Sequence, residues 1–199
     1  ELDKCADYIV DFFRGTDLKV EKIVHNNIPS VIVTKNKKTP KVLLCGHFDV
    51  VDGTDEQFEP VIKEDKLYGR GSFDMKSGDA VMMHIMRSLA DTDHDVGLII
   101  TGDEEIGGNS GVEYILNKLE YRPKVAVIPD GGNAVHKLIT KEKGLLRIIL
   151  KAEGTTAHSA YLWRGENAIN KLRSALDAVE KLFTPVEAHP EDHWVTTFN

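Results

Sequence analysis

Cysteine is scarce in this sequence. Its 199 residues include only two, Cys5 and Cys45, which stand far apart and form no Cys-x-x-Cys pair. Two isolated cysteines support neither a disulfide scaffold nor a zinc site built from thiolates. We therefore expect a reducing, cytoplasmic setting.

Long apolar runs and an excess of basic residues are also missing. The longest apolar stretches, such as Val42–Cys45 and Val96–Ile100, are far shorter than the roughly 20 residues that span a bilayer. Acidic residues outnumber basic ones by 32 to 25, which disfavours a surface for binding nucleic acid. Hydrophobic residues make up 41% of the chain, enough to bury a core. We expect neither a membrane segment nor a nucleic-acid partner.

Short apolar runs predict a buried sheet in residues 1–144. The predicted strands are Leu18–His25, Val31–Lys35, Val42–Cys45, Val96–Ile100 and Val125–Ile128. The last three lack polar alternation, which is typical of strands buried on both faces. Helical patterns separate these three, and a β-α-β-α-β order indicates a parallel or mostly parallel sheet. The predicted fold is α/β, with the sheet sandwiched by helices.

Three helical patterns accompany these strands. The first runs from Leu2 to Phe13 and stops at Gly15, a common signal for a helix end. The others are Met75–Ala90 and Ser110–Leu119. Their expected buried stripes are Val81, Ile85 and Leu89 in the second helix, and Val112, Ile115, Leu116 and Leu119 in the third.

The pattern changes from Leu145 onward. A predicted strand, Leu145–Ala152, is followed by a glycine-marked turn and by a helix with apolar residues from Ile169 to Phe183. A last predicted strand, Trp194–Phe198, runs into the chain end. Since an uncapped strand leaves an unpaired edge, we expect the natural protein to continue beyond this point.

Polar side chains follow the predicted parallel strands. His47 and Asp49 come after the first, Asp103, Glu104 and Glu105 after the second, and Asp130 after the third, while Asp74 ends a glycine-rich turn. Singly, such residues are typical of turns and exposed helix starts. Together they lie at the carboxyl ends of the strands, where open α/β sheets bind ligands. We expect them to share one crevice.

Such a cluster of carboxylates needs a cation. Several carboxylates packed around one histidine would repel one another and lose hydration, which a divalent ion relieves. Imidazole and carboxylate ligands without thiolate suit zinc, cobalt or manganese. A carboxylate shared between two ions is a usual way to hold a metal pair. The residues alone therefore make a two-metal site plausible.

Four ordered motifs resemble those of a known family. They are Gly46–Val51, Gly69–Lys76, Asp103–Gly107 and Pro129–Gly132. The family is the zinc metallopeptidases that include acetylornithine deacetylase, succinyl-diaminopimelate desuccinylase, aminoacylase and glutamate carboxypeptidase. Gly154, Ala157–Ser159 and Gly165–Ile169 are similar to the opening of that family's lid domain. The resemblance runs from about residue 42 to the end of the chain.

The resemblance implies a role for each metal-site residue. His47 and Asp130 would bind one zinc ion, Glu105 the second, and Asp74 both. The Asp74–Met75 peptide bond would be cis.

The resemblance also implies catalytic and substrate-binding roles. Glu104 would be the general base, which takes a proton from water and passes it to the leaving amine. Asp49 would accept the ring proton of His47 and fix its tautomer. His158, in the lid, would hold the developing oxyanion in the active site of a partner subunit.

The resemblance further implies how the chain is divided. Residues 1–144 would be the first part of the catalytic domain, and residues 145–199 the first half of an inserted α+β lid and dimerisation domain. The family's last metal-binding histidine, in the returning catalytic segment, has no counterpart here. We therefore expect this chain alone to hold at most one ion tightly, next to His47, and to be inactive.

The implied activity is hydrolysis of an amide or peptide bond beside a free carboxylate, as in an N-acyl amino acid or a short peptide. An aminopeptidase for di- and tripeptides is the first alternative, and the sequence does not separate the two. A metal-dependent binding module without catalysis is the second. Glu104 argues against that module, since binding alone needs no unliganded carboxylate beside the water.

Overall fold

A computed structural model describes residues 1–35, 38–130, 137–140, 144 and 146–182. The chain divides into two compact units, residues 1–135 and residues 136–199. Each unit is compact in itself. The candidate metal site lies in the first unit.

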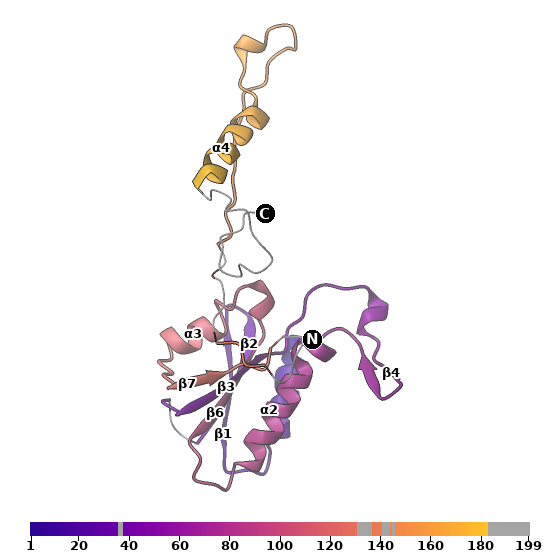
Figure 1. Cartoon of the computed structure of the whole chain (residues 1–199), viewed down its shortest axis with the longest axis vertical. Coiled ribbons are helices and arrows are strands. Elements are labelled where there is room, and N and C mark those ends of the chain that lie inside the picture. The colour runs from indigo at the N-terminus through magenta and orange to yellow at the C-terminus, as the bar shows by residue number, and fades with distance from the viewer. Residues whose placement is uncertain (36–37, 131–136, 141–143, 145, 183–199) are drawn as a thin grey trace. The chain divides into compact units, whose positions relative to one another are not determined.

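The first unit contains a mixed five-stranded sheet with the order β1-β2-β6-β3-β7 (Figure 1). Its strands are β1 (Lys19–His25), β2 (Ile28–Thr34), β3 (Val42–His47), β6 (Val96–Thr101) and β7 (Val125–Val127). β2 is antiparallel to both its neighbours, while β3 is parallel to both β6 and β7. Four strands therefore run in one direction, which confirms the predicted mostly parallel sheet.

Helices cover both faces of this sheet. Alternation along the strands turns Val31 and Leu98 toward one face and Ile32 and Ile99 toward the other. The first face packs against α1 (Leu2–Phe12) and α2 (Ser77–Ser88), and the second against α3 (Val112–Asn117). Each aliphatic side chain buried in this way contributes about 1.5–3 kcal/mol. The sandwich of helices and sheet was also predicted correctly.

The buried side of α2 differs from the prediction. Val81 and Ile85 are exposed, and the residues that contact the sheet are Met82, Met83 and Met86. The helix carries apolar residues on two overlapping stripes, and the long, flexible methionine side chains fill the space over the sheet. The same stripe continues one turn toward the helix start to a charged residue, Asp79.

The prediction for the last parallel strand is wrong about its burial. Val125 and Val127 are exposed, because β7 forms an edge of the sheet and pairs only with β3 among the described strands. The sequence pattern predicts an apolar strand, but it does not tell whether the strand lies at the centre or at the edge of a sheet.

A small hairpin lies between β3 and α2. A short 3₁₀ helix, η1 (Asp55–Phe58), leads into β4 (Val61–Lys63) and β5 (Lys66–Tyr68), which pair antiparallel. The two residues that join them, Glu64 and Asp65, both have positive φ, as a two-residue hairpin turn requires. This hairpin was not predicted, because strands this short carry too few residues for a period.

The second unit contains a short 3₁₀ helix, η4 (Leu162–Arg164), and the predicted helix, α4 (Ala168–Leu182). The predicted strand Leu145–Ala152 is wrong, since residues 146–152 form no strand. A strand needs a pairing partner, and the one bridge in the described part of this unit joins Thr155 to Glu166 instead. The predicted strand Trp194–Phe198 lies outside the described residues.

None of the helices in the described parts of the chain is long and apolar enough to cross a membrane.

Candidate metal centre

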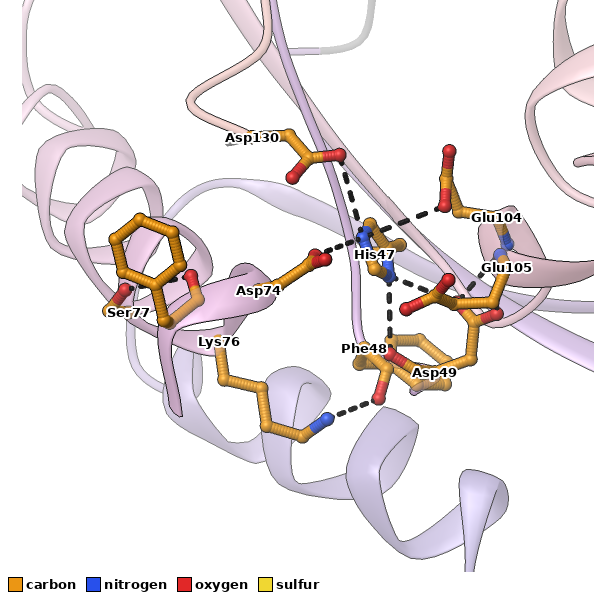
Figure 2. A network of polar contacts seen from close by, with 10 residues as sticks. His47, Phe48, Asp49, Asp74, Lys76, Ser77, Glu104, Glu105 and Asp130 are labelled. Carbon is orange, nitrogen blue, oxygen red and sulfur yellow. Dashed lines mark hydrogen bonds and ion pairs between the residues drawn. The ribbon is translucent and has the colours of Figure 1, made fainter. Parts of the chain in front are cut away.

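The candidate site gathers at the carboxyl ends of the parallel strands. His47 is the last residue of β3, Glu104 and Glu105 open the 3₁₀ helix η3 (Glu104–Ile106) after β6, and Asp130 follows β7. Asp74 lies in the turn η2 (Ser72–Lys76), whose Asp74–Met75 bond is cis as predicted. Figure 2 shows Asp74, Glu104 and Asp130 reaching toward His47 from three separate elements.

Three ligand atoms lie close enough to share one metal ion. His47 Nε2 is 3.1 Å from Asp74 Oδ1 and 3.7 Å from Asp130 Oδ2, and all three atoms lie within 4.8 Å of one another. We refer to His47, Asp74 and Asp130, the candidate ligands of one ion, as the ligand triad. One imidazole nitrogen and two carboxylate oxygens are a donor set that zinc accepts, with a further position left for water.

The electrostatics of the triad also fit a cation. Burial is the largest influence on His47 and lowers its pKa, but the hydrogen bond and charge of Asp49, with the charges of Glu104 and Asp130, raise it to about 9. Negative potential therefore outweighs a strong desolvation effect at this ring. A divalent ion would take the place of that proton, because metal ligation needs the neutral imidazole.

The backbone leading to His47 is tightly packed. A Cβ on Gly46 would lie 2.1 Å from Asp79 Oδ1 and 2.6 Å from Met82 Cε. No side chain fits there, so glycine lets α2 approach β3 directly beneath the triad.

Asp49 contacts both His47 and the segment that carries the two glutamates. Its Oδ1 lies 3.3 Å from His47 Nδ1, and its carbonyl oxygen is 3.2 Å from the same nitrogen. The backbone N–H groups of Glu104 and Glu105 donate to its two carboxylate oxygens at 3.1 and 3.0 Å. Burial raises the pKa of Asp49, but the bonds from His47 and from these two N–H groups outweigh it and lower the pKa.

The two glutamates differ in their relation to the triad. Glu104 Oε2 lies 3.8 Å from His47 Nε2, with its side chain half exposed. Burial, followed by the charges of Asp130, Glu105 and Asp49, raises the pKa of Glu104 against the opposing effect of His47. Glu105 is not part of the group of ligand atoms around His47. The described geometry thus brings together one complete set of three ligands.

Sequence reasoning missed Asp79, a buried carboxyl beneath the site. Its side chain is 4% exposed, and neither oxygen has a hydrogen-bond partner in the described part of the chain. Burial raises its pKa to about 7, with His47 and Lys76 opposing and Asp130 and Asp49 adding to the shift. Its spacing with Met82, Met83 and Met86 on one helical stripe is the signal that could have placed it inside.

This carboxyl should make the metal-free chain less stable as pH rises. Below about pH 4 it is protonated in both the folded and the unfolded chain, but between about pH 4 and pH 7 only the folded chain keeps the proton. The free energy of unfolding therefore falls through this window and stays lower above it. We expect Asp79→Asn to remove the part of the fall that Asp79 causes, leaving the part due to His47, and to be more stable than the wild type at pH 8, by a few kcal/mol at most.

Urea unfolding at pH 5 and pH 8, with a chelator present, measures this difference. Asp93→Asn, in an exposed loop, removes the same charge and should leave the pH dependence intact. Equal pH dependence in Asp79→Asn and the wild type would contradict the prediction.

The predicted substrate residue, His158, lies in the second unit. Its side chain is exposed, its Nδ1 accepts the backbone N–H of Ala160 at 3.1 Å, and its ring centre is 5.7 Å from that of Tyr161. Gly131 and Gly132, which follow Asp130 in the last catalytic motif, lie outside the described residues.

A comparison with known families agrees with this geometry. Residues 43–194 match the model of Peptidase family M20/M25/M40. The chain belongs to this family. All four motifs that carry the ligand triad and the two glutamates lie within the matched region, which confirms the resemblance in the sequence.

Relatives of this M20 chain are similar over most of its length. A Mycobacterium tuberculosis (strain CDC 1551 / Oshkosh) protein, provisionally named as the succinyl-diaminopimelate desuccinylase DapE, is 37% identical over 158 residues, covering 78% of this chain and 44% of the relative. The succinyl-diaminopimelate desuccinylase of Corynebacterium glutamicum (strain ATCC 13032) is 31% identical, covering 87% and 48%. The chain thus spans about half the length of the curated relatives it matches.

A solved structure shares the fold of this M20 chain. A tripeptidase from Staphylococcus aureus subsp. aureus Mu50 aligns with a TM-score of 0.57 at 18% identity, covering 88% of this chain and 50% of that one. Identity this low supports the fold and leaves the substrate open.

Proposed function

We propose that this M20 chain, in a protein of its relatives' full length, is a two-metal hydrolase. It would cleave an amide or peptide bond beside a free carboxylate, as in an N-acyl amino acid or a short peptide. The observation that carries the proposal is the position of Glu104, whose carboxylate lies 3.8 Å from the ring nitrogen of the triad's histidine. The chain thus holds a complete ligand set beside an ionisable group outside it.

The roles of the side chains follow from their positions. Asp74 and Asp130 would hold a zinc ion with His47, and Glu105 with Asp74 would begin a second site. Cobalt or manganese would suit the same ligands. When bound, the metal pair supplies positive charge that acidifies water and polarises the scissile carbonyl.

Glu104 would carry out both proton transfers of the reaction. Its carboxylate would take a proton from the water molecule while the water oxygen attacks the carbonyl carbon. The carboxyl group would then deliver this proton to the leaving nitrogen. Burial raises the pKa of Glu104, which makes its carboxylate a stronger base than an ordinary glutamate and favours taking the proton from water. Asp49 would keep the imidazole of His47 in the tautomer that leaves Nε2 free to bind metal.

The second unit would act as a lid. We assign residues 1–144 to the catalytic domain and residues 145–199 to the first half of a lid that also forms a homodimer. The exposed Ile169, Leu172 and Leu176 on α4 give this helix an uncovered apolar side that suits pairing. His158 would then reach a partner's site and stabilise the oxyanion.

A mixing experiment tests the role of His158. Full-length His158→Ala and Glu104→Gln subunits, each nearly inactive alone, should regain part of the wild-type activity when mixed, because one site in each heterodimer has both residues intact. Subunit exchange is followed by two affinity tags. Exchange without recovered activity would show that His158 does not act across the dimer.

The proposal also places the protein in the cytoplasm. Both cysteines are unpaired, and burial raises the pKa of Cys45 to about 11, so this thiol stays protonated and unreactive at neutral pH. Cell fractionation with an antibody against the chain tests the location, and recovery outside the cytoplasmic fraction would refute it.

Two alternatives lead to different results in a substrate screen. A di- or tripeptide aminopeptidase would cleave small peptides with a free amine, whereas a binding module would retain the metal without turnover. The full-length protein with zinc or cobalt is assayed on succinyl-diaminopimelate, acetylornithine, other N-acyl amino acids and dipeptides. We expect hydrolysis of an N-acyl substrate with a free carboxylate. Turnover of peptides with a free amine alone would favour the aminopeptidase, and metal binding without any turnover the binding module.

A further inference from the structure

One buried carboxylate next to the proposed base takes no part in the proposed chemistry. Asp103, directly before Glu104, is 2% exposed and lies outside the ligand triad. Its Oδ2 accepts the backbone N–H groups of Ser110 and Gly111 at 2.7 and 3.0 Å. Its carbonyl oxygen accepts the N–H of Gly108 at 2.7 Å. One residue therefore closes the loop from residue 103 to residue 111 at both ends.

The loop is shaped to fit around this carboxylate. Gly107 and Gly108 have φ of 107° and 68°, a left-handed backbone that reverses the chain and favours glycine. A Cβ on Gly111 would lie 2.2 Å from Asp103 Oδ1. Only glycine, which has no Cβ, therefore lets the backbone come this close to the carboxylate. The loop thus bonds Asp103 Oδ2, while Oδ1 lies against the space that Gly111 leaves and has no hydrogen-bond partner in the described part of the chain.

A second buried carboxylate accepts hydrogen bonds from the beginning of the same loop. Asp49, 8% exposed, accepts the backbone N–H groups of Glu104 and Glu105. Asp49 and Asp103 together accept four backbone N–H groups from residues 104–111. We refer to this pair as the carboxylate frame. Hydrogen bonds to charged acceptors are stronger and more directional than neutral ones, so four of them restrict the loop strongly.

We propose that Asp103 is a positioning residue for Glu104: with Asp49 it forms the carboxylate frame that fixes the segment Glu104–Ile106 and so aims the Glu104 side chain toward His47. The inference rests on the proposed role of Glu104 as general base. Asp103 itself would touch neither metal nor substrate. Its effect would pass through the backbone, because a base displaced by about 1 Å loses on the order of 10²-fold in rate.

Amide exchange in the 199-residue chain tests the frame without any activity. In Asp103→Ala we expect the N–H groups of Glu104 and Glu105 to exchange about 10- to 100-fold faster, although their own acceptors are on Asp49, since loss of a charge-assisted bond has an effect of this size. Asp103→Asn keeps one acceptor oxygen and should restore much of the protection. Faster exchange at Ser110 and Gly111 only would overturn the proposal, because Asp103 would then be a local cap.

Kinetics of the full-length enzyme provide the second readout. Asp103→Ala should lower kcat by about 10- to 100-fold with KM and zinc content unchanged, and Asp103→Asn should recover part of the loss. Ile115→Val, which shortens a buried side chain of α3, controls for simple destabilisation and should keep kcat. Unchanged kcat in Asp103→Ala, or loss of zinc from it, would contradict the positioning role.

The two readouts separate failure of this inference from failure of the proposed function. A wild-type full-length protein without hydrolase activity would refute the proposed function, and exchange of the Glu104 and Glu105 amides would still decide whether the frame exists. If Asp103→Ala does not fold, Asp103→Asn gives the same comparison, with smaller changes expected at the same four amides.

Discussion

Replacing Glu104 with glutamine is expected to lower the turnover of the full-length enzyme by about 10²–10⁴-fold, the range typical of general acid–base catalysis. Glutamine has nearly the same shape as glutamate but cannot accept a proton at neutral pH. Zinc content should stay unchanged, because Glu104 is not one of the ligand triad. Steady-state kinetics paired with metal analysis of the same preparation measure both quantities.

A matched variant distinguishes loss of the general base from loss of one negative charge. Glu113, exposed on α3, loses the same charge in Glu113→Gln, which should keep wild-type kcat. A change in KM rather than kcat for Glu104→Gln would indicate a role in binding substrate. Turnover within a few-fold of wild type would rule out Glu104 as the base.

The second large effect concerns metal binding by the 199-residue chain itself. We expect one tightly held zinc ion at the ligand triad, since this is the one group of three ligands that the described residues bring together. A second ion would have Asp74 and Glu105 but no third protein ligand among the described residues, so we expect it to bind weakly. Without it we expect no measurable amidase activity, because the second ion helps to clamp and polarise the substrate.

Metal analysis after dialysis, with thermal unfolding in the presence and absence of zinc, tests this expectation. Free zinc at about 100 times its Kd should stabilise the chain by about 2.7 kcal/mol. His47→Ala should lose both the ion and the stabilisation, whereas His94→Ala, at an exposed position, should lose neither. Two tightly held ions per chain, or turnover comparable to the full-length enzyme, would show the expectation to be wrong.

The sequence predicted the fold and the site best where several neighbouring residues give the same structural signal. The buried strands β3 and β6 each carry an uninterrupted apolar run, and the strand-end residues His47 and Asp130 stand where such runs stop. Ordered motifs also indicated the cis bond at Asp74–Met75, which no periodicity would predict. The convergence of His47, Asp74 and Asp130 from three separate elements could therefore be predicted from the amino-acid sequence alone, and their role as metal ligands stays a prediction.

Features that depend on packing partners were less accessible. Whether Val81 or Met82 faces the sheet depends on how α2 is rotated over β3, and the space left by Gly46 helps to decide that rotation. Residues 146–152 have the composition of a strand but pair with no other strand among the described residues. Asp103 was visible in the sequence as one more acid after β6, but its hydrogen bonds to the far end of the loop were not.

The order of the strands constrains when the site is assembled. β3 lies between β6 and β7, both of which come later in the chain, whereas β1 and β2 pair locally as a hairpin. During synthesis β3 therefore leaves the ribosome long before either of its neighbours, and it must remain unpaired until β6 emerges. His47 therefore spends that interval without Asp130, which follows β7. If the ligand triad binds an ion as proposed, binding would have to wait until β7 has emerged and paired with β3.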